Sequence, residues 1–142
     1  MSDIFSKEKR SEIMARIRGK NTGPERTVFR FLRQHGIYFQ RHYRRVKGCP
    51  DIALPRKKRA VFIDGGFWHG YDFEKRREKL LKADQYYWIQ KIERNVERDL
   101  EQRTALIESG WRVHQVWEHD LTKKSVRDAT LEGIREFLLA TE

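Results

Sequence analysis

Residues 51–64, DIALPRKKRAVFID, decide the fold class that we predict for this chain. Two short runs of mostly apolar residues, 51–54 and 59–64, lie on either side of the Pro-Arg-Lys-Lys segment at 55–58. Short β-rich runs separated by a few turn-forming residues are typical of a β-hairpin. We therefore expect two antiparallel strands here, with the rest of the fold built around them.

The register of this hairpin would bring two acidic residues together. If the turn is centred between residues 57 and 58, Asp51 faces Asp64, and directly opposed residues lie about 5 Å apart at their β-carbons. Like charges at this distance repel each other unless a cation lies between them, and Mg²⁺ prefers carboxylate oxygens. We expect Asp51 and Asp64 to hold a divalent ion; the alternative is two solvated acids at strand ends.

Residues 65–69, GGFWH, extend this site. The two glycines permit a sharp turn, and His69 then falls within reach of the acids. An imidazole has a pKa near neutrality, so His69 is a candidate general base towards a water nucleophile. The alternatives are a structural role for His69 and ordinary core packing for Phe67 and Trp68.

Further helices and strands are expected on both sides of the hairpin. We predict helices at about 6–18, 22–35, 84–109 and 125–139, strands at 37–43 and 111–117, and a charged loop or helix at 74–83. The apolar stripe expected in the long helix is Ile92, Val96, Leu100 and Ile107. This order of elements predicts an α/β fold with a mixed β-sheet flanked by helices.

The start of the second helix carries a further acid. Thr22 as the N-cap and Glu25 three residues later form the pattern of a capping box, with Pro24 in the first turn. The capping box is sufficient to explain why an acidic residue stands at position 25. The alternative is that Glu25 points from the end of the helix into the acid cluster.

The chain of 142 residues fits a single domain, with an N-terminal helical arm (about 1–22), a core (about 23–121) and the C-terminal helix. Its 31 Lys and Arg residues against 21 Asp and Glu residues give a net charge of +10, which favours a polyanionic partner. Candidate phosphate contacts are Arg16, Arg18, Lys20, Arg44 and Arg45, although such charges can also form a merely solvated face.

Composition also excludes several classes of protein. No apolar run approaches the roughly 18 residues of a membrane span, and the N-terminal sequence lacks the apolar stretch of a signal peptide. The single cysteine, Cys49, excludes an internal disulfide framework. We therefore expect a cytoplasmic protein without membrane partners.

Several segments, taken in order, carry a resemblance to a known family. They are RSEIM at 10–14, IRGKNTGPE at 17–25, GCPD at 48–51, VFIDGGFWHG at 61–70, Trp88, Lys91-Ile92, NVERD at 95–99, GWRV at 110–113 and VWE at 116–118. Together they resemble the very short patch repair (Vsr) endonucleases from about residue 5 to 121. The resemblance implies a PD-(D/E)XK (restriction-endonuclease-like) core that requires Mg²⁺ or Mn²⁺ and hydrolyses a DNA phosphodiester.

The same resemblance implies roles for individual residues. By position, Asp51 would be the central metal ligand. Asp64, from the hairpin argument, and the main-chain carbonyl of Ile63 are expected to hold the same metal ion. His69 would be the general base or would position the attacking water. Glu25 matches an acid of the family near the site.

Three aromatic residues match a further feature of the family. Phe67 and Trp68 correspond to aromatic side chains that wedge into the base stack beside a mismatch, and Trp88 resembles the third member of that wedge. Unstacking a base step costs a few kcal/mol and is cheapest at a mismatch.

The sequence also departs from the family. Repair members hold a structural zinc, and the corresponding positions here are Gly66, Tyr71, Phe73 and His119, three of which cannot bind zinc. No structural zinc is therefore expected. Asp64 stands where the repair enzymes tend to have histidine, and Gly66 occupies the position of the lysine in a typical PD-(D/E)XK motif.

These features leave three functions open. The first is a Mg²⁺-dependent endonuclease of bacterial cytoplasm that nicks double-stranded DNA beside T:G mismatches, working at the nucleoid. The second is a sequence-specific DNA endonuclease of restriction, defence or mobile-element type. The third is a DNA-binding module that has lost catalysis. A monomer and a dimer are both compatible with the sequence.

Overall fold

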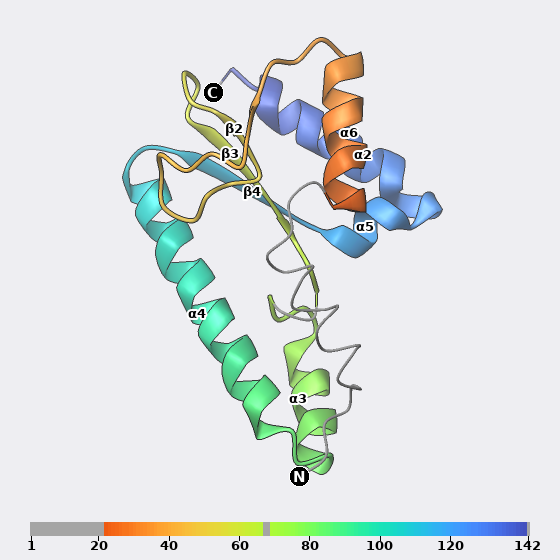
Figure 1. The fold of residues 1–142 in the computed structure, drawn as a ribbon. Coiled ribbons are helices and arrows are strands. Elements are labelled where there is room, and N and C mark those ends of the chain that lie inside the picture. Colours follow the sequence, from red (N-terminus) through yellow and green to blue (C-terminus); the bar gives the residue numbers. More distant parts are fainter. Residues whose placement is uncertain (1–21, 67–68, 142) are drawn as a thin grey trace.

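A computed structural model describes residues 22–66 and 69–141 (Figure 1). The predicted helix at 6–18, the candidate DNA contacts Arg16, Arg18 and Lys20, and the aromatic residues Phe67 and Trp68 lie outside these residues. Among the helices that are described, none is both long and apolar enough to cross a bilayer.

A four-stranded mixed sheet forms the centre of the fold. Its strands are β1 (Gln40–Arg41), β2 (Ile52–Leu54), β3 (Arg59–Asp64) and β4 (Arg112–Trp117), in the order β1-β2-β3-β4. The first three strands pair antiparallel, and β4 pairs parallel with β3. The predicted α/β fold with a mixed sheet flanked by helices is confirmed.

The β2–β3 hairpin forms as predicted, but its predicted register is wrong by two residues. Ile52 pairs with Val61 rather than with the residue two positions later. The strands are joined by the loop 55–58, whose last residue has a left-handed φ of 55° and whose N–H groups bond to carbonyls at the start of the loop. Because this loop centres the turn one residue earlier than expected, Asp51 does not face Asp64 across the hairpin.

Five described helices surround the sheet. They are α2 (Gly23–Gln34), α3 (Phe73–Lys82), α4 (Tyr86–Glu108), α5 (Glu118–Thr122) and α6 (Lys124–Leu139). The side chains of β3 alternate between two apolar clusters. Val61 and Ile63 pack with α2, α5 and α6, whereas Ala60 and Phe62 pack with Leu106 of α4. Figure 1 shows α2, α5 and α6 on one side of the sheet and α4 on the other, with α3 beside the first half of α4.

The predicted start of α2 is confirmed in detail. The Glu25 N–H donates to Thr22 Oγ1 at 3.4 Å, and the Thr22 N–H donates to Glu25 Oε1 at 3.1 Å, so both halves of the capping box are present. This box fixes the Glu25 carboxyl group at the N-terminus of α2, where the helix dipole favours negative charge.

The predicted apolar stripe of α4 is wrong beyond Ile92. Ile92 is fully buried, but Val96 is 39% exposed, Leu100 is 68% exposed and Ile107 is 55% exposed. A single stripe assumes that a helix packs against one surface. Instead, the first half of α4 packs against α3 and its end packs against the sheet, so the buried face changes along the helix.

Two further elements differ from prediction. The strand expected at 37–43 is reduced to β1, which ends where His42 has a left-handed φ of 47°, although the main-chain hydrogen bonds towards Pro50 and Asp51 continue past it. The short helix α5, directly after β4, was not predicted. The charged segment at 74–83, left open as loop or helix, belongs to α3.

Candidate functional site

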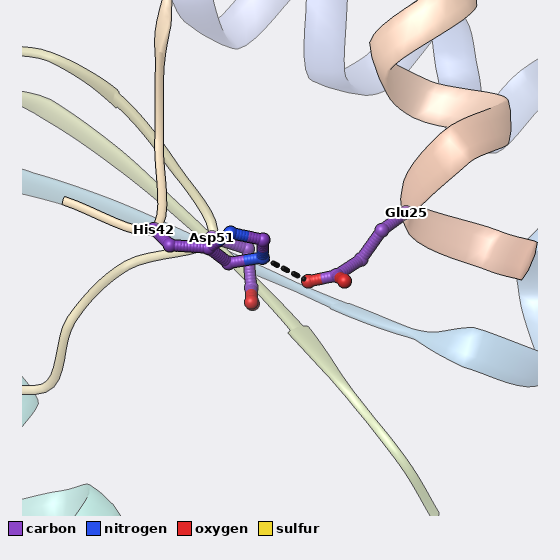
Figure 2. A group of neighbouring side chains, drawn as sticks. All are labelled: Glu25, His42 and Asp51. Atoms are coloured by element: carbon purple, nitrogen blue, oxygen red, sulfur yellow. Dashed lines mark hydrogen bonds and ion pairs between the residues drawn. The ribbon is translucent and has the colours of Figure 1, made fainter. Parts of the chain in front are cut away.

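The first group of candidate side chains consists of Glu25, His42 and Asp51, here called the Asp51 group. Glu25 reaches from the N-terminus of α2, His42 follows β1, and Asp51 precedes β2 (Figure 2). Their potential ligand atoms lie within 4.8 Å of one another. The His42 Nε2 atom lies 2.9 Å from Glu25 Oε2. Three separate segments of the chain thus meet at one point.

Negative charge is concentrated in the Asp51 group. Burial and the adjoining Glu25 carboxyl group raise the pKa of Asp51 well above its ordinary value, although the N–H of Ile63 opposes this shift. Burial also opposes ionisation of Glu25, but hydrogen bonds from Asp51 and His42 outweigh it and lower the pKa of Glu25. The two shifts run in opposite directions because the carboxyl groups adjoin each other: ionisation of one disfavours ionisation of the other.

The second group consists of Asp64, His69 and Asp99, here called the His69 group. His69 Nδ1 bonds to Asp99 Oδ2 and lies 3.8 Å from Asp64 Oδ1. Burial favours the neutral imidazole, but the hydrogen bond to Asp99 and the charge of Asp64 raise the pKa of His69. Burial of Asp99 is likewise outweighed by its bond to His69, and its pKa is lowered.

Asp64 also forms an ion pair with the guanidinium group of Arg103. Arg103 Nη1 and Nη2 donate to the two oxygens of Asp64 at 2.7 and 2.8 Å, which is a bidentate pair. Gln115 Nε2 adds a third hydrogen bond at 3.2 Å. The Arg103 guanidinium also lies over the Phe62 ring, 4.1 Å from its centroid, which orients it. Asp64 is 4% exposed, so this is a buried ion pair.

The two groups meet at the end of β3. The Ile63 N–H donates to Asp51 Oδ2 at 2.7 Å, and the next residue, Asp64, belongs to the His69 group. The charge of Asp64 also contributes to the raised pKa of Asp51. The predicted association of Asp51, Asp64 and His69 therefore arises through neighbouring residues at the end of β3 and not through facing positions in the hairpin.

The comparisons with known proteins agree with this geometry. The family described as "DNA mismatch endonuclease Vsr" matches residues 2–75. The chain belongs to the Vsr endonuclease family. Like other members, it is a DNA endonuclease that depends on a divalent metal ion, and the PD-(D/E)XK-like fold of the family is the α/β fold described above.

Individual relatives are similar over most of their length. "Type II nicking enzyme V.XorIIP" of Xanthomonas oryzae pv. oryzae is 38% identical over 94% of this chain and 97% of that protein. "Type II nicking enzyme V.NmeAIP" of Neisseria meningitidis serogroup A is 39% identical over 89% of each chain. "DNA mismatch endonuclease Vsr" of Escherichia coli K12 is 30% identical over 97% of this chain and 88% of that protein.

The aromatic residue predicted to approach DNA from α4 is buried. Trp88 is 1% exposed and packs with Leu80, Ile89 and Ile92 between α3 and α4. In this conformation it has no surface to offer to a base, which argues against the predicted wedge role. The predicted phosphate contacts Arg44 and Arg45 are exposed in the turn after β1.

Three of the four positions matched to the zinc site of Vsr repair enzymes lie close together. The Tyr71 ring lies 4.3 Å from the His119 ring and 5.2 Å from the Trp117 ring, and a Cβ at Gly66 would lie 3.3 Å from Tyr71 Cβ. Phe73 packs against the cluster between α3 and α4. Ring packing thus occupies this place, and the expectation of no structural zinc stays a prediction, to be tested by elemental analysis.

Sequence reasoning missed four residues of this Vsr site. Asp99 and Arg103 are separated by four positions in α4 and therefore share a face of the helix, but the pattern gave no reason to relate them to Asp64. Asp99 is the last residue of the family segment NVERD, and this position could have identified it as a candidate site residue. Nothing in the sequence distinguished His42 or Gln115.

Proposed function

We propose that this protein hydrolyses one strand of double-stranded DNA beside a T:G mismatch, with Mg²⁺ bound at the Asp51 group. The observation that carries the proposal is the pair of neighbouring carboxyl groups of Glu25 and Asp51 in that group. Buried like charges destabilise a fold unless a cation accompanies them, so their presence together indicates a site used for a metal.

The donor set of the Asp51 group fits this metal. Carboxylate oxygens are the ligands that Mg²⁺ and Mn²⁺ prefer, and neither ion needs cysteine. We assign Asp51 and Glu25 as side-chain ligands and the main-chain carbonyl of Ile63 as a third. Asp64, which the sequence also predicted as a metal ligand, is a weaker candidate than Glu25 because Arg103 already neutralises it. When bound, the metal polarises the scissile phosphate and lowers the pKa of a bound water.

His69 is proposed to accept the proton of the attacking water. The lowered pKa of Asp99 makes its carboxylate a pure acceptor, so the His69 Nδ1 atom carries the hydrogen of their bond. The lone pair of the imidazole is then on Nε2, which is the atom that takes the proton. Asp99 fixes this tautomer and stabilises the imidazolium that forms, as the acid does in a catalytic triad.

Nicking beside a mismatch is supported by the relatives. The family is described as a DNA mismatch endonuclease, and several relatives are described as nicking enzymes. Phe67 and Trp68 retain the proposed role of wedge, and a wedge costs least where the bases already pair badly. Arg16, Arg18, Lys20, Arg44 and Arg45 are proposed to bind phosphates of the DNA backbone.

The test uses end-labelled duplexes, fully paired or with a single T:G mismatch, incubated with Mg²⁺ or with EDTA. We expect a Mg²⁺-dependent nick in one strand of the mismatched duplex only. Asp51→Asn should remove the nick while binding of DNA stays within a few-fold.

Other results would select the other functions. Cutting of both strands of a paired duplex at a defined sequence would show a site-specific endonuclease of restriction or defence type and would overturn the mismatch proposal. Binding without any cutting of either duplex would show a catalytically silent DNA-binding module.

A further inference from the structure

A groove of about 620 Å³ lies along α2, beside the Asp51 group. It is lined by Arg26, Phe29, Arg30, Arg33, Gln34 and Arg41. Arg26, Arg30 and Arg33 are spaced by four and three residues and therefore lie on one face of the helix. Arg41 comes from β1, so two separate segments direct arginine side chains into the same groove.

The groove is strongly positive. Four of its six lining residues are arginines, and none of the six is acidic. Within the described part of the chain, Arg26, Arg30 and Arg33 make no ion pair, whereas Arg127 and Arg135 on α6 each contact a neighbouring carboxylate. Like charges at these helical spacings destabilise a helix. An anionic ligand in the groove would remove that repulsion.

The groove is also connected to the Asp51 group. Its floor is the Phe29 ring, which is 2% exposed and contacts the His42 ring edge-on with centroids 6.0 Å apart. The Arg41 guanidinium lies over the same ring, 5.5 Å from its centroid. In the sequence, Arg26 follows Glu25 and Arg41 precedes His42. The two walls of the groove are therefore continuous with two residues of the proposed metal site.

We propose that this groove binds backbone phosphates of the DNA strand next to the phosphate that is cleaved. Guanidinium groups bind phosphate through two parallel hydrogen bonds, and contacts of this kind set the position of the duplex without reading its sequence. The proposal rests on the proposed nicking of duplex DNA at the Asp51 group, which supplies the strand. It assigns to α2 the task of fixing the position of that strand at the Asp51 group.

The test is the salt dependence of DNA binding by the double variant Arg30→Gln/Arg33→Gln, measured by fluorescence anisotropy in EDTA with a labelled duplex. Both side chains lie at the surface, so the variant is expected to fold, and circular dichroism checks this. Removing one arginine–phosphate pair reduces the slope of log K against log salt by about 0.9. We expect the slope to fall by about 1 to 2 units and the affinity at low salt to fall at least about tenfold.

Two further variants distinguish the effect of losing contacts in the groove from the effect of lowering the net charge of the protein. Arg127→Gln/Arg135→Gln removes the same number of charges from α6, where each arginine already has a carboxylate partner, and should leave the slope unchanged. Arg30→Lys/Arg33→Lys keeps the charge of the groove and should retain most of the slope.

Three outcomes decide the proposal. If the affinity of the groove variant and that of the α6 variant fall equally, the effect is one of net charge and the groove proposal is wrong. If polyglutamate binds the groove while the DNA slope is unchanged, the ligand is an acidic protein and not DNA. If the wild-type protein binds DNA through the groove but does not nick the T:G duplex with Mg²⁺, the mismatch-nicking proposal fails and the groove proposal stands.

Discussion

The Asp51 group and the His69 group each contain two carboxyl groups and one histidine, yet they differ in how their charge is balanced. In the His69 group, Arg103 neutralises Asp64, and Asp99 accepts a hydrogen bond from the His69 imidazole. In the Asp51 group, one basic side chain, His42, lies beside two carboxyl groups, and the pKa of Asp51 is raised well above its ordinary value by burial and by Glu25.

This difference in charge balance indicates which group is better suited to bind a metal ion. A set of charges that is already balanced gains little from an added cation, whereas a set with excess negative charge gains much. The Asp51 group therefore suits the metal, and the His69 group suits the transfer of a proton. The predictions below test this division.

The largest effect is expected for Asp51→Asn. Loss of a metal ligand should lower the single-turnover cleavage rate by at least about 10³-fold, or about 4 kcal/mol of transition-state stabilisation. In EDTA, the same variant should be at least as stable as the wild type, because it removes a buried acid beside another acid. Single-turnover kinetics and thermal unfolding with and without Mg²⁺ measure both effects. A variant that loses stability in EDTA would contradict the excess charge that we assign to this group.

The next effect is expected for Arg103→Met, which removes the counter-ion of Asp64. Breaking a buried ion pair from one side costs about 3–5 kcal/mol of stability. The altered His69 group would then resemble the Asp51 group, so added Mg²⁺ should stabilise the variant more than it stabilises the wild type. Urea unfolding with and without Mg²⁺ checks this, and Arg103→Lys is the control that keeps the charge. An equal response of variant and wild type to Mg²⁺ would show that charge balance does not separate the two groups.

A smaller effect on cleavage is expected for Asp99→Asn. This change keeps the size of the side chain but no longer fixes the hydrogen on His69 Nδ1, and outer partners of this kind contribute about 10- to 100-fold. Cleavage at saturating DNA should fall by that factor, while DNA binding should not change. Glu101→Gln, an exposed change two residues further along α4, is the matched control. Weakened DNA binding by Asp99→Asn would point to a structural role for the pair instead.

The smallest effect concerns a histidine outside both groups. Burial lowers the pKa of His114, whose ring stacks on Phe137 of α6 with centroids 5.0 Å apart. Its contribution to stability is complete above the unfolded pKa of about 6.5 and is lost as the pH falls through the lower folded pKa. His114→Gln should therefore flatten the decrease in unfolding free energy below pH 6.5. An unchanged curve would assign that decrease to the two acid–histidine groups.

Local chemistry made much of the fold predictable. The Thr22–Glu25 capping box and the apolar runs of β2, β3 and β4 act over a few residues, and each formed close to its predicted position. The resemblance of short segments to the Vsr endonucleases was confirmed as well. Errors arose where packing between distant segments decided the result, as in the exposed Leu100 and the buried Trp88.

The sequence by itself determined the kinds of elements, their order and the family, because these depend on local propensity and on recognisable segments. It also identified Asp51 and His69 as candidates, with their roles still proposals. Only the tertiary structure decided which charges lie together, because a shift of two residues in one hairpin and a contact between Arg103 and Asp64, 39 positions apart, cannot be derived from spacing. Charge balance in a buried site depends on such distant partners, and it is this balance that distinguishes the two groups.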